Sequence, residues 1–78
     1  MNFLKDKVRK YQEKKLLEAQ DKIKFHTKIK NHLEKDLKKY DGGNISNLKT
    51  EIKKQDEFIK IWEKNVNSIK NQIKKLDK

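Results

Sequence analysis

Side chains that could catalyse a reaction or hold a metal ion are few in this chain. The only histidines, His26 and His32, stand six positions apart, so they cannot share one face of a helix around one ion. His32 and Asp36 lie one helical turn apart, a spacing more typical of a surface ion pair than of a metal site. The sequence has no cysteine and no glycine-rich phosphate loop. We therefore expect no enzymatic activity, no cofactor and no metal site.

Positive charge is the more prominent chemistry of the sequence. Lysine and arginine total 22 against 12 aspartate and glutamate residues, so the formal net charge is +10. Residues 1–17 and residues 64–78 each have a net charge of +4. If these two stretches meet in the fold, they form a basic patch that can bind phosphate groups by releasing counterions. The candidate nucleic-acid contacts are Lys5, Arg9, Lys10, Lys74 and Lys75.

The positive charge can also arise for reasons unrelated to nucleic acid. Arg9 is the only arginine, and lysine is a point charge that reads bases poorly, so recognition of a specific base sequence is not indicated. Lysine and asparagine have AT-rich codons, and a low-GC genome produces such an excess without selection for binding. Lysines near a helix C-terminus also offset the helix dipole. A solvated lysine-rich surface therefore remains the alternative to a nucleic-acid site.

The elements that position these side chains are expected to form an all-α helical hairpin. The sequence has no proline to break a helix, and its only glycines are Gly42 and Gly43. Gly42 suits the left-handed position after a helix, and Asn44 suits the N-cap of the next helix. A turn this short makes the two helices antiparallel neighbours. The predicted elements of a single domain over residues 1–78 are a helix over 3–40, a turn over 41–44 and a helix over 45–77.

A regular apolar seam supports this coiled-coil hairpin. In the second helix the seam residues alternate at spacings of three and four, with β-branched side chains at heptad position a. They are Ile45, Leu48, Ile52, Gln55, Ile59, Trp62, Val66, Ile69, Ile73 and Leu76. Those of the first helix are Leu16, Ala19, Ile23, His26, Lys30, Leu33, Leu37 and Tyr40. When the chain is folded about the turn, each a position of one helix faces a d position of the other, for example Lys30 and Gln55. The heptad frames of the two helices are assigned separately, so this agreement supports the hairpin.

The start of the first helix is expected to follow a different frame. Leu4, Val8 and Tyr11 are spaced as a seam, but the step from Tyr11 to Leu16 is five residues. We therefore predict that the seam shifts there, so that Tyr11 packs against Ile73. A parallel dimer of the second helix is the competing architecture. Its β-branched a positions favour that dimer, whereas the short turn and the matched frames favour the hairpin.

Four large apolar residues fall outside the seam. Phe25 and Ile61 occupy heptad position c, and Ile29 and Phe58 occupy position g. In an antiparallel pair the g positions meet on one side of the seam, so the four side chains share one face at nearly the same height. Exposing them together is costly, and such a patch typically marks a protein contact. Three outcomes stay open: rotation of the helices to bury them, self-association into a four-helix bundle, or contact with a different protein.

The sequence therefore predicts a non-enzymatic protein-interaction module whose first candidate partner is a second copy of the chain, in a homodimer, and whose second is another protein. The alternative is a lysine-rich nucleic-acid-binding protein that uses the basic end. A small inhibitor or adaptor from a phage or other mobile element is a third hypothesis. No stretch approaches the ~18 apolar residues of a membrane span, and the start lacks the apolar core of a signal peptide. We expect a cytoplasmic protein without membrane contact.

Overall fold

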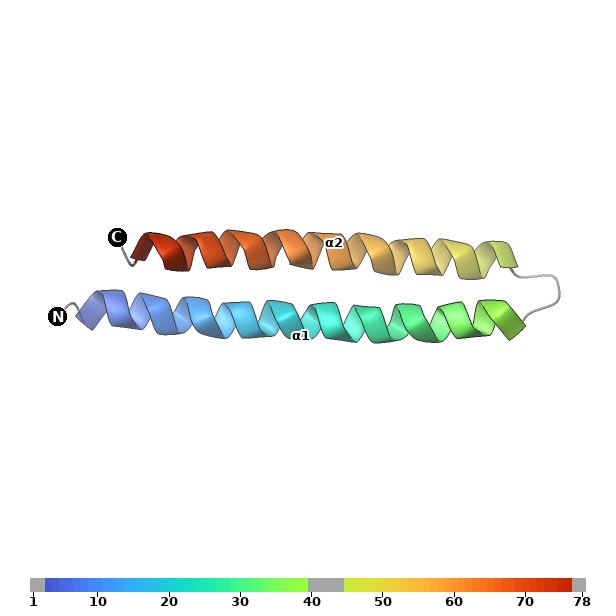
Figure 1. Cartoon of the computed structure of the whole chain (residues 1–78), viewed down its shortest axis with the longest axis horizontal. Helices are drawn as coiled ribbons and strands as arrows, with labels where there is room; N and C mark the ends of the chain where they lie inside the picture. Colours follow the sequence, from blue (N-terminus) through green and yellow to red (C-terminus); the bar gives the residue numbers. More distant parts are fainter. Residues whose placement is uncertain (1–2, 40–44, 77–78) are drawn as a thin grey trace.

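Two long helices lie side by side and run in opposite directions (Figure 1). The computed structural model describes α1 over Phe3–Lys39 and α2 over Ile45–Leu76. The helices pack against each other along their length, so the predicted all-α hairpin is confirmed. Residues 1–2, 40–44 and 77–78, which include Tyr40 and the predicted turn, lie outside the described part of the chain.

The hairpin is a thin rod that measures 63 × 14 × 12 Å along its principal axes. The first turns of α1 and the last turns of α2 lie at the same end of this rod (Figure 1). We call this the open end and define it by residues 3–17 of α1 and 64–76 of α2. The arrangement therefore brings the two basic stretches of the sequence together.

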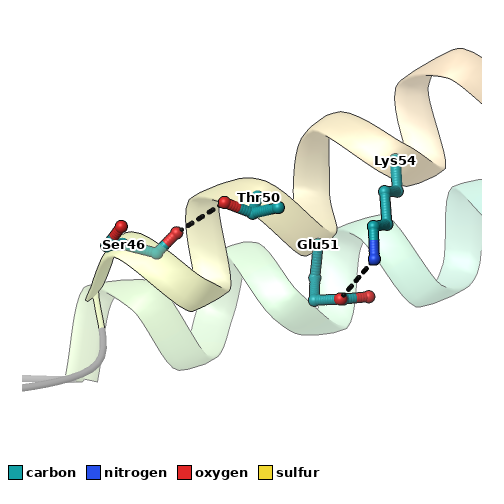
Figure 2. A network of polar contacts seen from close by, with 4 residues as sticks. All are labelled: Ser46, Thr50, Glu51 and Lys54. Carbon is teal, nitrogen blue, oxygen red and sulfur yellow. Dashed lines mark hydrogen bonds and ion pairs between the residues drawn. The ribbon is translucent and has the colours of Figure 1, made fainter.

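Local side-chain contacts show how the first turns of α2 are stabilised (Figure 2). The Thr50 hydroxyl donates a 2.9 Å hydrogen bond to the backbone carbonyl of Ser46, one turn earlier. The Lys54 ammonium lies 3.3 Å from the Glu51 carboxylate. An exposed pair at this spacing contributes about 0.2–0.5 kcal/mol to helix stability. Positive charge also occupies the last turn of each helix, where the dipole favours it: Lys38, Lys39, Lys74 and Lys75.

The predicted seam is where the two helices meet. Every seam residue within the described ranges, from Leu16 to Leu37 in α1 and from Ile45 to Leu76 in α2, is buried or half-buried. The tightest point is Ala19, which is 1% exposed, and Val66, which is 8% exposed. The periodic pattern therefore identified the contacting faces of both helices. Among the described residues only Ala19 and Val66 are buried, because two helices alone cannot enclose a deep core.

The polar layer in the middle of the seam has side-chain contacts that the predicted pairing of Lys30 with Gln55 did not specify. Each of these two residues has a partner of its own. His26 Nδ1–H donates to Gln55 Oε1 over 2.7 Å, and Lys30 Nζ lies 2.7 Å from a carboxylate oxygen of Asp56. Lysine turns to the carboxylate at the edge of the seam because a charge-assisted bond to Asp56 is stronger than one to a neutral amide. The amide of Gln55 is then available to the imidazole.

The predicted shift of the seam near the start of α1 is wrong. Leu4, Val8 and Tyr11 are exposed, whereas the positions that continue the downstream heptad, Lys5, Arg9 and Gln12, are half-buried. An uninterrupted helix keeps its phase, and a shifted seam would require a local change of twist. Long polar side chains can occupy these positions because their aliphatic stems pack while their polar ends reach water. The seam therefore becomes polar on α1 at the open end.

The ion pair between Lys30 and Asp56 is expected to make stability depend on pH. The hydrogen bond that the Lys30 ammonium donates to Asp56 raises the pKa of Lys30 above the ordinary value of 10.5. Because the folded pKa is the higher one, this contribution is fully present below about pH 10.5 and is lost as the pH rises through the raised value.

Asp56→Asn should therefore lower the urea midpoint at pH 8, and the deficit should shrink as the pH rises above about 10.5. Urea unfolding followed by circular dichroism at pH 8 and at about pH 11.5 measures this difference. An equal deficit at both pH values would mean that the pair does not act through the charge of Lys30.

Candidate functional site

The four apolar residues predicted to lie off the seam do share one exposed side of the hairpin. We call this side the second face and define it by Phe25, Ile29, Phe58 and Ile61. Phe25 is 57% exposed, Phe58 43% and Ile61 55%, while Ile29 is half-buried. The helices therefore do not rotate enough to bury these side chains, and the second face stays in contact with water in the single hairpin.

An aromatic stack joins the two helices at the centre of the second face. The ring of His26 stacks on Phe58 with centroids 4.9 Å apart, and it meets Phe25 edge-on at 5.2 Å. The hydrogen bond to Gln55 holds this imidazole in place. His26 thus acts as a bridge that positions one phenylalanine from each helix, and the centre of the second face is built before any partner arrives.

A shallow apolar depression adjoins this stack. It has a volume of about 360 Å³ and is lined by Phe25, Lys28, Ile29, His32 and Leu33 of α1. It lies toward the end where α1 stops. A depression lined by one helix alone is too open for a small-molecule site, which normally encloses most of its ligand.

Leu4, Val8 and Tyr11 extend the second face to the open end. With the heptad of α1 unbroken, they occupy the same c and g positions as Phe25 and Ile29. Leu4 is 71% exposed and Tyr11 58%. The residues of this side of α1 recur at spacings of four and three: Leu4, Val8, Tyr11, Lys15, Glu18, Lys22, Phe25 and Ile29. The signal was present in the sequence, since continuing the frame of Leu16 upstream assigns the same positions.

A wider groove connects the two apolar parts of the second face. It has a volume of about 580 Å³ and lies between the helices, where Ala19 of α1 is small. Trp62 and Ile69 form its floor together with Ala19. Its α2 rim carries uncharged polar residues, Asn65, Ser68 and Gln72, and its α1 rim carries Tyr11, Gln12, Lys15, Glu18 and Lys22. The groove exposes part of Trp62, which is otherwise packed in the seam.

The basic residues at the open end divide into two groups. Lys10, Lys74 and Lys75 are exposed, as expected for phosphate contacts. Lys5 and Arg9 are instead half-buried at seam positions, so they do not project as freely as predicted. Within the described residues the open end carries ten basic and two acidic side chains, from residues 3–17 and 64–76. Strong positive charge is therefore present, but the one arginine is partly engaged in packing.

Aromatic side chains accompany this charge. The ammonium of Lys7 lies 5.1 Å from the ring centroid of Phe3, and that of Lys15 lies 5.5 Å from the centroid of Tyr11. Such contacts contribute about 0.5–1 kcal/mol at exposed sites. They hold lysines over the exposed rings, so the apolar side chains at the open end are surrounded by positive charge.

Comparison with protein-family models, with curated proteins and with solved structures found no match. The function must therefore be inferred from the geometry of the described residues.

Sites for metals and membranes receive no support from the described helices. Between residues 3 and 39 and between 45 and 76, no group of three or more acidic, histidine or cysteine side chains is arranged to hold an ion. Over the same ranges, neither helix has an apolar stretch that could cross a lipid bilayer. The second face and the basic open end are the features of this structure that favour binding.

Proposed function

We propose that the chain is a cytoplasmic protein-interaction module that acts through the second face, with a second copy of itself as the partner. The observation that carries this proposal is the exposure of Phe25, Phe58 and Ile61 side by side on a folded hairpin. Full burial of such a side chain is worth about 1.5–3 kcal/mol, so covering the patch gives a substantial driving force for association. Two hairpins joined by their second faces make a four-helix bundle, a common solution for amphipathic helices.

The thin core supports the same proposal. Among the described residues of the seam only Ala19 and Val66 are buried, which is little for a chain of 78 residues. Small domains with insufficient cores are often stabilised by oligomerisation. A bundle would bury the second face and deepen the existing core around Trp62, so association and folding stability are coupled.

Light scattering on a size-exclusion column tests this proposal. The chain has a mass of 9.5 kDa, and we expect twice that mass at micromolar concentration. Phe58→Lys with Ile61→Lys should shift the mass to that of a monomer, because two charges would have to enter the interface without partners. Leu17→Lys is the matched control, since Leu17 is also an exposed apolar residue but lies off both the seam and the second face. A dimer that withstands the double substitution would exclude the second face as its interface.

The basic open end favours a second candidate function, binding of nucleic acid. Ten basic against two acidic side chains at one end of a rod attract phosphates, and exposed Phe3 and Tyr11 offer rings for stacking on bases. The two functions differ in their response to salt. Binding to a DNA or RNA oligonucleotide through several phosphates should weaken about 10³-fold or more between 50 and 200 mM salt. Apolar dimerisation should change little, and a lack of oligonucleotide binding at 50 mM salt would exclude the second candidate.

A further inference from the structure

Along the second face, the order of apolar and charged residues on α1 is similar whether it is read from the start of the helix or backwards. Its positions along the second face begin with apolar residues, continue with charged ones and end with apolar ones. We infer that two copies of this chain associate with their first helices antiparallel, so that the start of each α1 lies on the centre of the other copy's second face. This inference rests on the proposed function and adds the orientation and register of the partner.

The outer layers of this arrangement are apolar. When two copies of α1 lie antiparallel in this register, Leu4 faces Ile29 and Val8 faces Phe25. By symmetry each pair occurs twice. Leu4, Val8 and Phe25 are exposed in the single hairpin, so the contact covers the side chains that the hairpin leaves in water. The partner's Leu4 would enter the depression lined by Phe25 and Ile29.

The inner layers are complementary in charge. The same register places Lys15 opposite Glu18, again twice, and places Tyr11 opposite Lys22. A lysine over a tyrosine ring repeats the kind of contact that Lys15 already makes with Tyr11. No layer between Leu4 and the symmetry axis brings like charges together. Opposite charges in facing positions fix a register even where they add little affinity.

Other registers of the same two helices lose this match. A shift of one heptad in one direction keeps Tyr11 opposite Ile29 and Glu18 opposite Lys22, but it places Leu4 opposite Asp36 and Lys15 opposite Phe25. A shift in the other direction places Leu4 opposite Lys22 and Val8 opposite Glu18, so that apolar side chains face charges. The matched register is therefore specified by both polarity and charge.

The second helix agrees with the register chosen from the first. Because α1 and α2 are packed together in each hairpin, the position of α1 against the other copy's α1 also determines the position of α2 against the other copy's α2. Asn65 then lies opposite Gln72, with Ser68 beside the symmetry axis, and Ile61 lies nearest to Lys75 among the second-face positions of the other copy. Lys75 is the only charged residue of this group, and its long side chain lets the ammonium stay in water while the stem packs.

Charge at the open end favours this dimer over a parallel one. Residues 3–17 and 64–76 each have a net charge of +4, whereas residues 18–63 have a net charge of +2. A parallel dimer would bring two open ends together within a Debye length of about 8 Å and make them repel. The antiparallel dimer places residues 3–17 of each α1 against residues 16–30 of the other copy, which have a net charge of only +2, although residues 64–73 of the two α2 helices still face each other.

Engineered disulfides test the register, because the natural chain has no cysteine. In Leu4→Cys with Ile29→Cys, the two thiols of one chain stand about 37 Å apart along the helix and cannot join. The proposed dimer brings each beside the other thiol of the second copy, so oxidation should give a covalent dimer. Each single variant should remain uncrosslinked, since its two thiols lie at opposite ends of the contact.

A charge exchange gives an independent readout in the unoxidised protein. Lys15→Glu should weaken dimerisation about tenfold by placing two glutamates opposite Glu18, and Glu18→Lys should do the same with lysines. The double exchange should restore the parent affinity. Lys14→Glu is the matched control, because it makes the same change of charge at the neighbouring residue of α1, which is exposed and lies on neither the seam nor the second face.

The outcomes separate the two levels of inference. The register is supported if the double cysteine variant crosslinks while each single variant does not, and if the double charge exchange restores the parent dimer affinity. A protein of dimeric mass that neither crosslinks nor responds to Lys15→Glu overturns the register but leaves the proposed function standing. A parent protein that stays monomeric at micromolar concentration overturns both.

Discussion

Val66→Asp is expected to unfold most of the hairpin at 25 °C. Val66 is 8% exposed and packs at the level of Ala19, the tightest point of the seam. A carboxylate at this position would be buried without a cationic partner or would have to take up a proton, and either costs several kcal/mol. A protein of 78 residues has a total stability of about 4–12 kcal/mol. The substitution therefore removes a large part of the free energy that holds the helices together.

Circular dichroism and urea unfolding measure this loss. Asn67→Asp is the control, because the neighbouring residue is exposed and gains the same charge in the same helix. It should unfold at nearly the parent urea concentration. If Val66→Asp retained the parent helicity and urea midpoint, the interface of α1 with α2 would lie elsewhere than on this seam.

Val8→Asp should weaken dimerisation more than a hundredfold while leaving the helices folded. In the hairpin Val8 is exposed, so an aspartate there stays in water and affects the monomer little. In the antiparallel dimer it would face Phe25 of the second copy, and the contact occurs twice. Two buried, unpaired carboxylates cost about 3–6 kcal/mol together, and each 1.4 kcal/mol corresponds to a factor of ten in affinity.

Sedimentation equilibrium over a range of concentrations gives the dimer constants. Leu17→Asp is the matched control, since Leu17 is an exposed apolar residue of the same helix that lies on neither the seam nor the second face. Its dimer constant should equal that of the parent. Equal effects of the two substitutions would show that the open end of α1 does not enter the interface, even if Phe58 and Ile61 do.

Much of this architecture could be predicted from the order of residues alone. Spacings of three and four from Leu16 to Leu37 and from Ile45 to Leu76 identified both contacting faces, because a helix repeats its faces at nearly that interval. The same periodicity placed Phe25, Ile29, Phe58 and Ile61 together on the other side. Local pattern is sufficient here because each helix makes one long contact with one neighbour.

The error at the start of α1 has a clear physical cause. Leu4, Val8 and Tyr11 were assigned to the seam because apolar residues are normally buried, and the required shift of frame was accepted as its consequence. In the structure the helix keeps its phase and places Lys5 and Arg9 in the seam instead. Apolar character alone could not decide which of two apolar surfaces these residues join, because both surfaces are stripes on the same helix.

The sequence by itself determined the class of fold, the pairing of the two helices and the concentration of positive charge at one end. All of these follow from the helical period, the single glycine pair and the positions of the lysines. Only the tertiary structure decided the phase of α1 at the open end, the partners of Lys30 and Gln55, and the aromatic stack around His26. These depend on the distance and rotation between two packed helices, because side chains choose among several partners within reach only once both backbones are in place.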